Sequence, residues 1–242
     1  MSFARATLRL SRSRHKLVQT GPVDWPLLAG LPEDDVRQLL SIARRRTFSK
    51  GEVVFHRDDL AESLHLVVRG HFAVRVRTQV GDSVLLDVIG PGRAFGELAL
   101  LRDDSRRSAT VSALEEGETR SVFRTDFAEL QRCHPGVKDV LLSLLAEQLE
   151  RASDRILEAH YVDAETRVRR RLVELGETYG HGDGATVVPL TQEDLAAMAG
   201  TSRATVNRVL RDEERRGTLQ LGRGRATLVD AGELARRCRW HV

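Results

Sequence analysis

Short runs of alternating apolar and polar residues fill the chain from Arg44 to about Phe127. Because successive side chains of a strand point to opposite faces, this alternation predicts strands with one buried side. Glycines separate the runs at short intervals, which is typical of a closed antiparallel roll that can hold one small ligand. The expected strands are Gly51–Phe55, Leu64–Val68, His71–Val76, Ser83–Val88, Ser108–Val111 and Thr119–Phe123.

The hydrophobic period changes after Pro135. No proline or glycine interrupts the chain from Val137 to Tyr161, and apolar residues recur there every three or four positions. This spacing predicts one long helix, which either lies on its own domain or pairs with a second copy. At about 1.5 Å per residue the helix would span about 37 Å, more than a small roll needs for cover, so we expect a homodimer through residues 135–162. The apolar positions are Leu142, Leu145, Leu149, Ala152, Ile156 and Ala159.

A helix, a tight turn and a second helix are predicted between Thr191 and Leu210. Thr191 begins the first helix in a capping-box pattern with Asp194, Gly200 supplies the turn, and Thr201 or Ser202 caps the second helix. The second helix turns basic and short residues away from its apolar face, which is what a DNA major groove admits and reads. The alternative is an ordinary helical hairpin with a solvated basic face. The outward residues are Arg203, Ala204, Asn207 and Arg208.

The segments around this motif complete a winged arrangement. Asp163 is expected to cap the preceding helix, and two short strands flank the turn Gly222-Arg223-Gly224. Arg223 and Arg225 on that wing either meet DNA phosphates or lie in a solvated turn. A last short helix is expected after Asp230. The DNA-contacting residues predicted for the whole domain are Thr191, Ser202, Arg203, Ala204, Asn207, Arg208 and Arg223.

These patterns predict an α+β chain of four parts. They are a basic and disordered tail (1–23), an antiparallel β-roll (24–134), a long dimerisation helix (135–162) and a winged helix-turn-helix domain (163–242).

The net charge is only +3, so the position of the arginines says more than their number. The sequence has no run of 18 apolar residues, so it predicts no membrane span. It has only two cysteines, Cys133 and Cys238, which are too few for a cysteine-bound zinc or iron–sulfur site. No catalytic motif is present, so we expect a cytoplasmic protein that is not an enzyme.

A second chemical motif lies inside the predicted roll. Gly96-Glu97-Leu98 is followed about ten residues later by Arg107-Ser108. An arginine fork and a serine hydroxyl suit a phosphate, and a carboxylate accepts from a ribose hydroxyl, so the set suits an anionic sugar-containing ligand. The alternative is a salt bridge on a surface turn.

With the roll, long helix and winged helix in this order, the chain resembles the catabolite activator protein (Crp/Fnr) family of bacterial transcription regulators. The resemblance runs from about Trp25 to Val229. It implies that Glu97 holds the ribose 2′-hydroxyl of a cyclic nucleotide, that Gly96 permits close approach, and that Arg107 and Ser108 hold the cyclic phosphate. It also implies a DNA operator and RNA polymerase as partners.

The chain departs from the family pattern at three places. The family's Thr-Ser pair, which contacts adenine with the serine coming from the opposite subunit, is Ala152-Ser153 here. The usual Gly-Asp or Gly-Glu turn is Asp58-Asp59, which tolerates a left-handed backbone. Ala204 replaces a common glutamate between two base-reading arginines, so the contact to cytosine is lost.

The predicted function is therefore a homodimeric, DNA-binding transcription regulator controlled by a small ligand, with cyclic AMP or cyclic GMP as candidates. The alternatives are a roll that serves only as a dimer scaffold, or a ligand that is not a cyclic nucleotide. Haem bound by His65 or His71 is a further alternative, although histidines on strands are more often ordinary strand residues. Activation and repression are not distinguished by the sequence.

Overall fold

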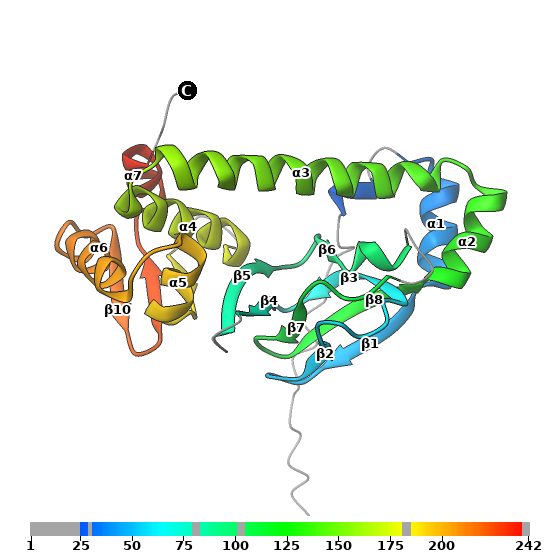
Figure 1. The fold of residues 1–242 in the computed structure, drawn as a ribbon, viewed down its shortest axis with the longest axis horizontal. Helices are drawn as coiled ribbons and strands as arrows, with labels where there is room; N and C mark the ends of the chain where they lie inside the picture. The colour runs from blue at the N-terminus through cyan, green and yellow to red at the C-terminus, as the bar shows by residue number, and fades with distance from the viewer. Residues whose placement is uncertain (1–24, 29–30, 79–82, 101–104, 181–184, 239–242) are drawn as a thin grey trace, which may run out of the picture.

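The computed structural model describes residues 25–28, 31–78, 83–100, 105–180 and 185–238. The expected tail of residues 1–23 lies outside these ranges. A β-roll and a winged helix lie side by side, and the long helix α3 (Val137–Tyr161) runs along both of them (Figure 1). Among the described residues, no helix has the length and apolar character that a membrane crossing requires.

The roll is made of two antiparallel four-stranded sheets with the orders β1-β8-β3-β6 and β2-β7-β4-β5. Aromatic rings fill the space between the sheets, with Phe72 edge-on to Phe48 at 5.6 Å and 5.3 Å from Phe95. The predicted roll is confirmed. Its strands are β1 (Arg44–Phe48), β2 (Val53–Phe55), β3 (Ser63–Arg69), β4 (Phe72–Arg77), β5 (Ser83–Ile89), β6 (Ala94–Phe95), β7 (Thr110–Ala113) and β8 (Gly117–Phe123).

Two predicted backbone features of the roll are present. Asp58 has a φ of 70°, so the turn at Asp58-Asp59 is left-handed as expected. Gly96 has a φ of 84°, and a Cβ at this position would lie 2.6 Å from the Arg107 guanidinium and 2.9 Å from the Ser63 carbonyl oxygen. Gly96 is therefore required both by its backbone angle and by the closeness of Arg107.

Helices cover one end of the roll. They are the short turn η1 (Pro26–Leu28) with α1 (Glu33–Ile42), α2 (Arg124–Cys133) and the first half of α3. Val140 and Leu144 of α3 are buried in one cluster with Leu39 of α1 and Phe127 of α2. Beyond Leu144, Glu158 is the one buried residue of α3. The first half of α3 thus packs into the core of its own domain, and the second half lies over the roll and along the winged helix with most of its side chains outside any core.

The winged helix forms around the predicted caps. Asp163 accepts a hydrogen bond from the Thr166 amide, Thr191 forms the capping box with Asp194, and Ser202 caps the second helix of the motif. Gly200 is left-handed at the turn, with a φ of 58°. The elements are α4 (Ala164–Tyr179), β9 (Thr186–Val188), α5 (Gln192–Ala199), α6 (Arg203–Arg215), β10 (Leu219–Gly222), β11 (Arg225–Leu228) and α7 (Ala231–Arg237).

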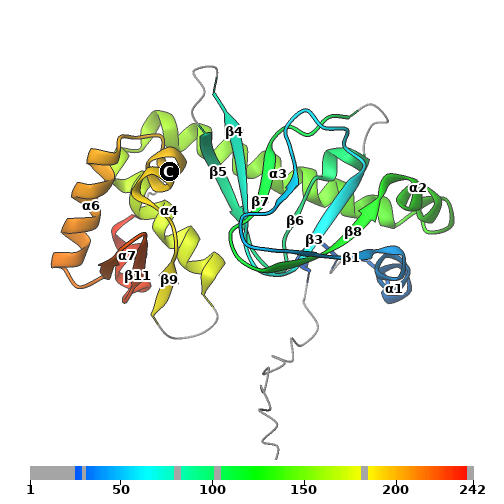
Figure 2. The same ribbon diagram turned by 90° about the horizontal axis from the view of Figure 1, so that it is seen from below.

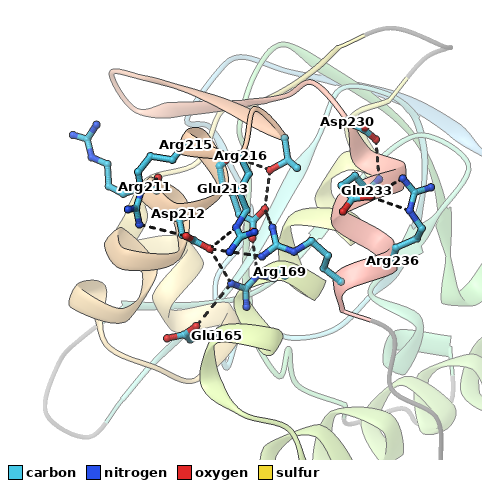
Figure 3. A network of polar contacts seen from close by, with 12 residues as sticks. Glu165, Arg169, Arg211, Asp212, Glu213, Arg215, Arg216, Asp230, Glu233 and Arg236 are labelled. Carbon is cyan, nitrogen blue, oxygen red and sulfur yellow. Dashed lines mark hydrogen bonds and ion pairs between the residues drawn. The ribbon is translucent and has the colours of Figure 1, made fainter.

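A buried ion network ties α6 to its neighbours (Figure 3). Glu213 is fully buried, and its two carboxylate oxygens lie 2.7 Å from Arg169 of α4 and 2.7 Å from Arg237 of α7. Its carboxylate also accepts from the Thr218 hydroxyl at 2.8 Å. This network fixes the helix that carries the expected DNA-reading residues.

The roll and the winged helix share a hydrophobic core. Ala73 of β4 and Val88 of β5 belong to the same buried cluster as Leu172 of α4 and Leu195 of α5. An ion pair of 2.9 Å joins Arg75 of β4 to Asp194, the capping-box residue of α5. The roll therefore contacts the first helix of the helix-turn-helix directly.

Candidate functional site

Five of the six predicted ligand residues line one cavity of about 330 Å³ in the roll. They are Gly96, Glu97, Leu98, Arg107 and Ser108. Glu97 begins the short turn η2 (Glu97–Leu100) directly after Gly96, and its carboxylate is buried. The alternative, a salt bridge on a surface turn, does not describe Glu97 and Arg107, because both are buried and both line a cavity.

The Arg107 side chain is buried, and one of its N–H groups donates to no described residue. Its Nη1 donates to the carbonyl oxygens of Ser63 at 2.8 Å and Gly96 at 3.2 Å, and its guanidinium carbon lies 3.9 Å over the Phe55 ring. Its Nε is buried and has no hydrogen-bond partner among the described residues. Because such a donor is costly to leave unpaired, the site favours an anion with an oxygen to offer here.

The charge of Arg107 persists at neutral pH despite its burial. Desolvation lowers the pKa of Arg107 to about 10, and the nearby Glu97 carboxylate opposes that shift. The guanidinium is thus cationic, and it lies in a pocket that excludes much of the solvent. An anionic ligand would meet a weakly screened positive charge at this point.

His65 supports Arg107 from the core of the roll. Its ring is stacked 5.0 Å from Phe95, and its two nitrogens lie 3.1 Å from the hydroxyls of Ser63 and Thr119. Desolvation, reinforced by Arg107 and Arg46, lowers the pKa of His65 to about 3, so the ring is neutral. Because both ring nitrogens contact hydroxyl groups, His65 has none to offer to a haem iron. Instead, His65 contacts the Ser63 hydroxyl, and Ser63 in turn accepts hydrogen bonds from Arg107.

Charged residues that sequence reasoning missed line the same cavity. Asp87 of β5 pairs with Arg93 at 2.9 Å, and Arg155 of α3 donates to the Leu86 carbonyl oxygen at 2.6 Å. Arg151 also lines this cavity. These four side chains also line a second cavity of about 440 Å³ between the roll, α3 and α4. No local motif marks them, because they come from three separate parts of the chain.

The α6 helix presents the expected reading face to solvent. Arg203, Ala204, Asn207 and Arg208 are all exposed. In both views α6 lies on the side of the winged helix that faces away from the roll (Figures 1 and 2). Arg208 forms an ion pair of 2.9 Å with Glu165, which is exposed and therefore of small energetic value.

A concave surface joins the start of α5, α6 and the wing. It encloses about 680 Å³, and its lining includes Thr191, Arg203, Asn207 and Arg223 of the predicted DNA-contacting set. The hydroxyls of Thr191 and Ser202 serve as helix caps in this structure. Their contacts to DNA stay predictions, as does that of Arg223 on the exposed wing.

Comparison with known proteins agrees with both halves of this description. A cyclic nucleotide-binding domain matches residues 45–133, and a Crp-like helix-turn-helix domain matches residues 166–237. The chain is 36% identical over 210 residues to the cyclic AMP receptor protein of Thermus thermophilus, covering 86% of this chain and 94% of that protein. The chain belongs to the Crp/Fnr family.

Other Crp/Fnr relatives support the same assignment. A CRP-like cAMP-activated global transcriptional regulator of Mycobacterium tuberculosis is 30% identical over 196 residues, which cover 79% of this chain and 87% of that protein. The crystal structure of the Thermus thermophilus catabolite activator protein matches with a TM-score of 0.51 at 34% identity, covering 88% of this chain and 98% of that one. The protein is a Crp-family DNA-binding transcription regulator with a cyclic nucleotide-binding domain.

In this Crp/Fnr protein Ala152 and Ser153 are neighbours in α3, but only Ala152 lines the ligand cavity. Ala152 lines the ligand cavity and brings no polar atom to it. Ser153 is not part of the lining; it is exposed, and its hydroxyl donates to the Leu149 carbonyl oxygen at 2.9 Å. Within one chain Ser153 therefore does not reach the pocket, and its predicted role depends on a second subunit.

Proposed function

We propose that cyclic AMP is the ligand of this regulator and that it binds in the cavity around Arg107. The observation that carries the proposal is the buried Arg107 guanidinium, whose Nε has no partner among the described residues, beside Glu97 and Ser108. Arg107 and Ser108 would hold the cyclic phosphate, and Glu97 would accept from the ribose hydroxyl. The choice of cyclic AMP over cyclic GMP follows the two relatives that are named for cyclic AMP.

Calorimetry with cyclic AMP and cyclic GMP tests this proposal, together with selection of operators from a random DNA pool in the presence and absence of each nucleotide. We expect heat with cyclic AMP and tighter operator binding in its presence. A preference for cyclic GMP would correct the ligand but keep the sensor. Tight operator binding with no heat from either nucleotide would instead establish the roll as a scaffold only.

We further propose a homodimer that forms through the exposed apolar face of α3. Leu142, Leu149 and Ile156 are 58%, 70% and 62% exposed, and each lies seven residues from the next. Seven residues are about two helical turns, so the three side chains form one apolar stripe along the helix. A second copy of α3 covers such a stripe and places Ser153 beside the opposite pocket.

Leu149→Glu is expected to weaken the dimer at least about tenfold, because burial of one leucine contributes about 1.5–3 kcal/mol and the new charge opposes it. Sedimentation equilibrium of the full chain measures the change. Glu147→Gln is the control, since Glu147 forms only an exposed ion pair with Arg151 on the same helix. Equal dimer affinity for both variants would argue against α3 as the interface.

We propose that the two recognition helices of the dimer, one from each subunit, bind a pseudo-palindromic operator whose half-sites lie ~34 Å apart. Nucleotide binding between the roll and α3 would shift the population toward the arrangement with this spacing. We propose that the protein acts in the cytoplasm, where it meets the operator and RNA polymerase, and that it catalyses no reaction.

Replacing Arg203 or Arg208 by alanine is expected to weaken operator binding by about 1–3 kcal/mol each, because each arginine is placed to donate to guanine O6 and N7. Ala204→Glu is expected to add a preference for cytosine at the base that faces it, since a carboxylate accepts from the cytosine amino group. Fluorescence anisotropy on a set of operator variants measures both. Arg211→Ala, on the same exposed helix beyond the expected base contacts, is the control; an equal loss there would indicate a general charge effect.

A further inference from the structure

One amide on the reading face of α6 is held in place by the helix beside it. Asn207 is exposed, and its Nδ2 donates to the Oε1 of Gln192, the first residue of α5, at 3.2 Å. Gln192 is half-buried and directly follows Thr191, which caps α5 through the capping box with Asp194. The cap fixes the backbone at Gln192, and Gln192 in turn orients the Asn207 amide.

A shared core fixes the two helices that carry these amides. Leu195 and Ala199 of α5 are buried in the same cluster as Val206 of α6, which directly precedes Asn207. Both amide residues line the concave surface between α5, α6 and the wing. Because the Asn207 side chain is already ordered there, less conformational entropy is lost when it meets a ligand.

The groups left free on Asn207 are a donor next to an acceptor. An asparagine amide has two N–H groups and one oxygen, and Gln192 takes one N–H, so one N–H and Oδ1 remain. In the major groove adenine presents its N6 amino donor beside its N7 acceptor, whereas guanine presents two acceptors, O6 and N7. Adenine therefore matches the free edge of the Asn207 amide at both atoms, and guanine places its O6 against Oδ1.

Of the four outward residues of α6, Asn207 alone offers an acceptor. Arg203 and Arg208 carry donors only, which suits guanine, and Ala204 has no polar side-chain atom. Asn207 lies four residues after Arg203 and three after Ala204, so it shares their face of the helix about one turn further along. The reading face thus combines two side chains suited to guanine with one suited to adenine.

We propose, on the DNA-reading role given to α6 above, that Asn207 reads an adenine of the operator and that Gln192 is its positioning residue. The Asn207 Oδ1 accepts from the adenine N6 amino group, and the free Nδ2–H donates to N7. Each half-site then contains an A·T pair whose adenine faces Asn207, which neither arginine selects.

Operator selection from a random DNA pool, with and without cyclic AMP, locates this base for the parent chain and for Asn207→Ala. We expect one position per half-site at which the parent selects adenine and Asn207→Ala selects no base. On synthetic operators, fluorescence anisotropy should show that the preference for adenine over guanine falls about 5- to 100-fold in Asn207→Ala, the value of one bidentate contact. Gln220→Ala, an exposed amide of β10 outside the concave lining, is the control and should keep the preference.

Modified bases test the contact at a single atom. 7-Deazaadenine lacks the N7 acceptor, so at this position it is expected to weaken operator binding by the parent about 2- to 10-fold, the value of one hydrogen bond. It should leave the affinity of Asn207→Ala unchanged. 3-Deazaadenine differs from adenine only in the minor groove and should leave the affinity of both proteins unchanged.

Two variants of Gln192 test its positioning role. Gln192→Ala is expected to lower the adenine preference about 2- to 10-fold with an unchanged thermal melt, because the released Asn207 amide must then be ordered on binding. Gln192→Glu retains an oxygen that accepts from Nδ2, so the ratio of affinities for adenine and guanine operators should be restored, while its negative charge lowers the affinity for both. Equal ratios in Gln192→Ala and the parent overturn the positioning role.

Comparison with Arg203→Ala separates failure of this assignment from failure of the reading role of α6. If Arg203→Ala changes the selected sequence and Asn207→Ala leaves every base preference as in the parent, the assignment of Asn207 is overturned, even where overall affinity falls. If neither variant changes the selected sequence, the reading role of α6 is overturned as well. Selection of another base at the position that depends on Asn207 overturns the choice of adenine.

Discussion

Glu213→Gln is expected to lower the free energy of unfolding by about 3 kcal/mol, the largest stability effect of a single side chain that we expect in the winged helix. The Glu213 carboxylate is fully buried and neutralises Arg169 and Arg237 while accepting from the Thr218 hydroxyl. A neutral amide keeps the shape but leaves both guanidinium groups short of a counter-charge. Their remaining partner in common is Asp212, at 3.7 Å from each.

Urea denaturation followed by circular dichroism measures this loss. Glu233→Gln is a matched control, because Glu233 forms an ion pair with Arg236 on the surface of α7 (Figure 3). Exposed pairs contribute about 0–1 kcal/mol, so the control should change the stability by less than about 1 kcal/mol. Similar losses in the two variants would show that burial does not make the Glu213 network more stabilising than an exposed ion pair.

Arg107→Gln is expected to weaken cyclic-nucleotide binding about 30- to 100-fold, which corresponds to about 2–3 kcal/mol. The substitution removes the buried positive charge and the Nε donor, which no described residue accepts from; these are the features that suit a cyclic phosphate. In the presence of nucleotide, operator affinity should fall to the value of the ligand-free protein. Calorimetry and anisotropy measure the two effects separately.

Two further variants define the reason for that loss. Arg107→Lys keeps the charge without the planar fork and is expected to have intermediate affinity. Arg106→Gln is the control, since the exposed Arg106 side chain donates to the Asp58 carbonyl oxygen at 2.7 Å and does not line the cavity. We expect Arg106→Gln to change affinity by less than about threefold, a small fraction of a charged hydrogen bond. Unchanged affinity in Arg107→Gln would remove the main support for the nucleotide site.

Some elements of the fold gave no clear periodic signal in the sequence. Strand β1 has the sequence Arg-Arg-Arg-Thr-Phe, and only Phe48 is buried, so no alternation is visible. It forms through backbone pairing with β8. Strand β6 has only two residues, too few for any pattern. Helix α1 did carry a usable signal, because Pro32 precedes three acidic residues in its first turn.

The sequence by itself determined the features that depend on neighbours a few residues apart. The caps at Asp163, Thr191 and Ser202 each bond to an amide three residues ahead, so the order of residue types was sufficient to place them. The same holds for the left-handed turns at Asp58 and Gly200.

Only the tertiary structure decided which distant side chains meet. Arg107 is held by Ser63, which lies 44 positions away, and His71 contacts Thr178 across 107 positions. Asp87, Arg93 and Arg155 converge on the ligand cavity from β5, the segment after it and α3. Such contacts depend on how separate elements pack, and no spacing along the chain encodes that packing. For this reason the contacts of His71 with Glu115 of the roll and with Thr178 and Tyr179 of α4 became visible only in three dimensions, since the sequence predicted this residue only as part of an ordinary strand.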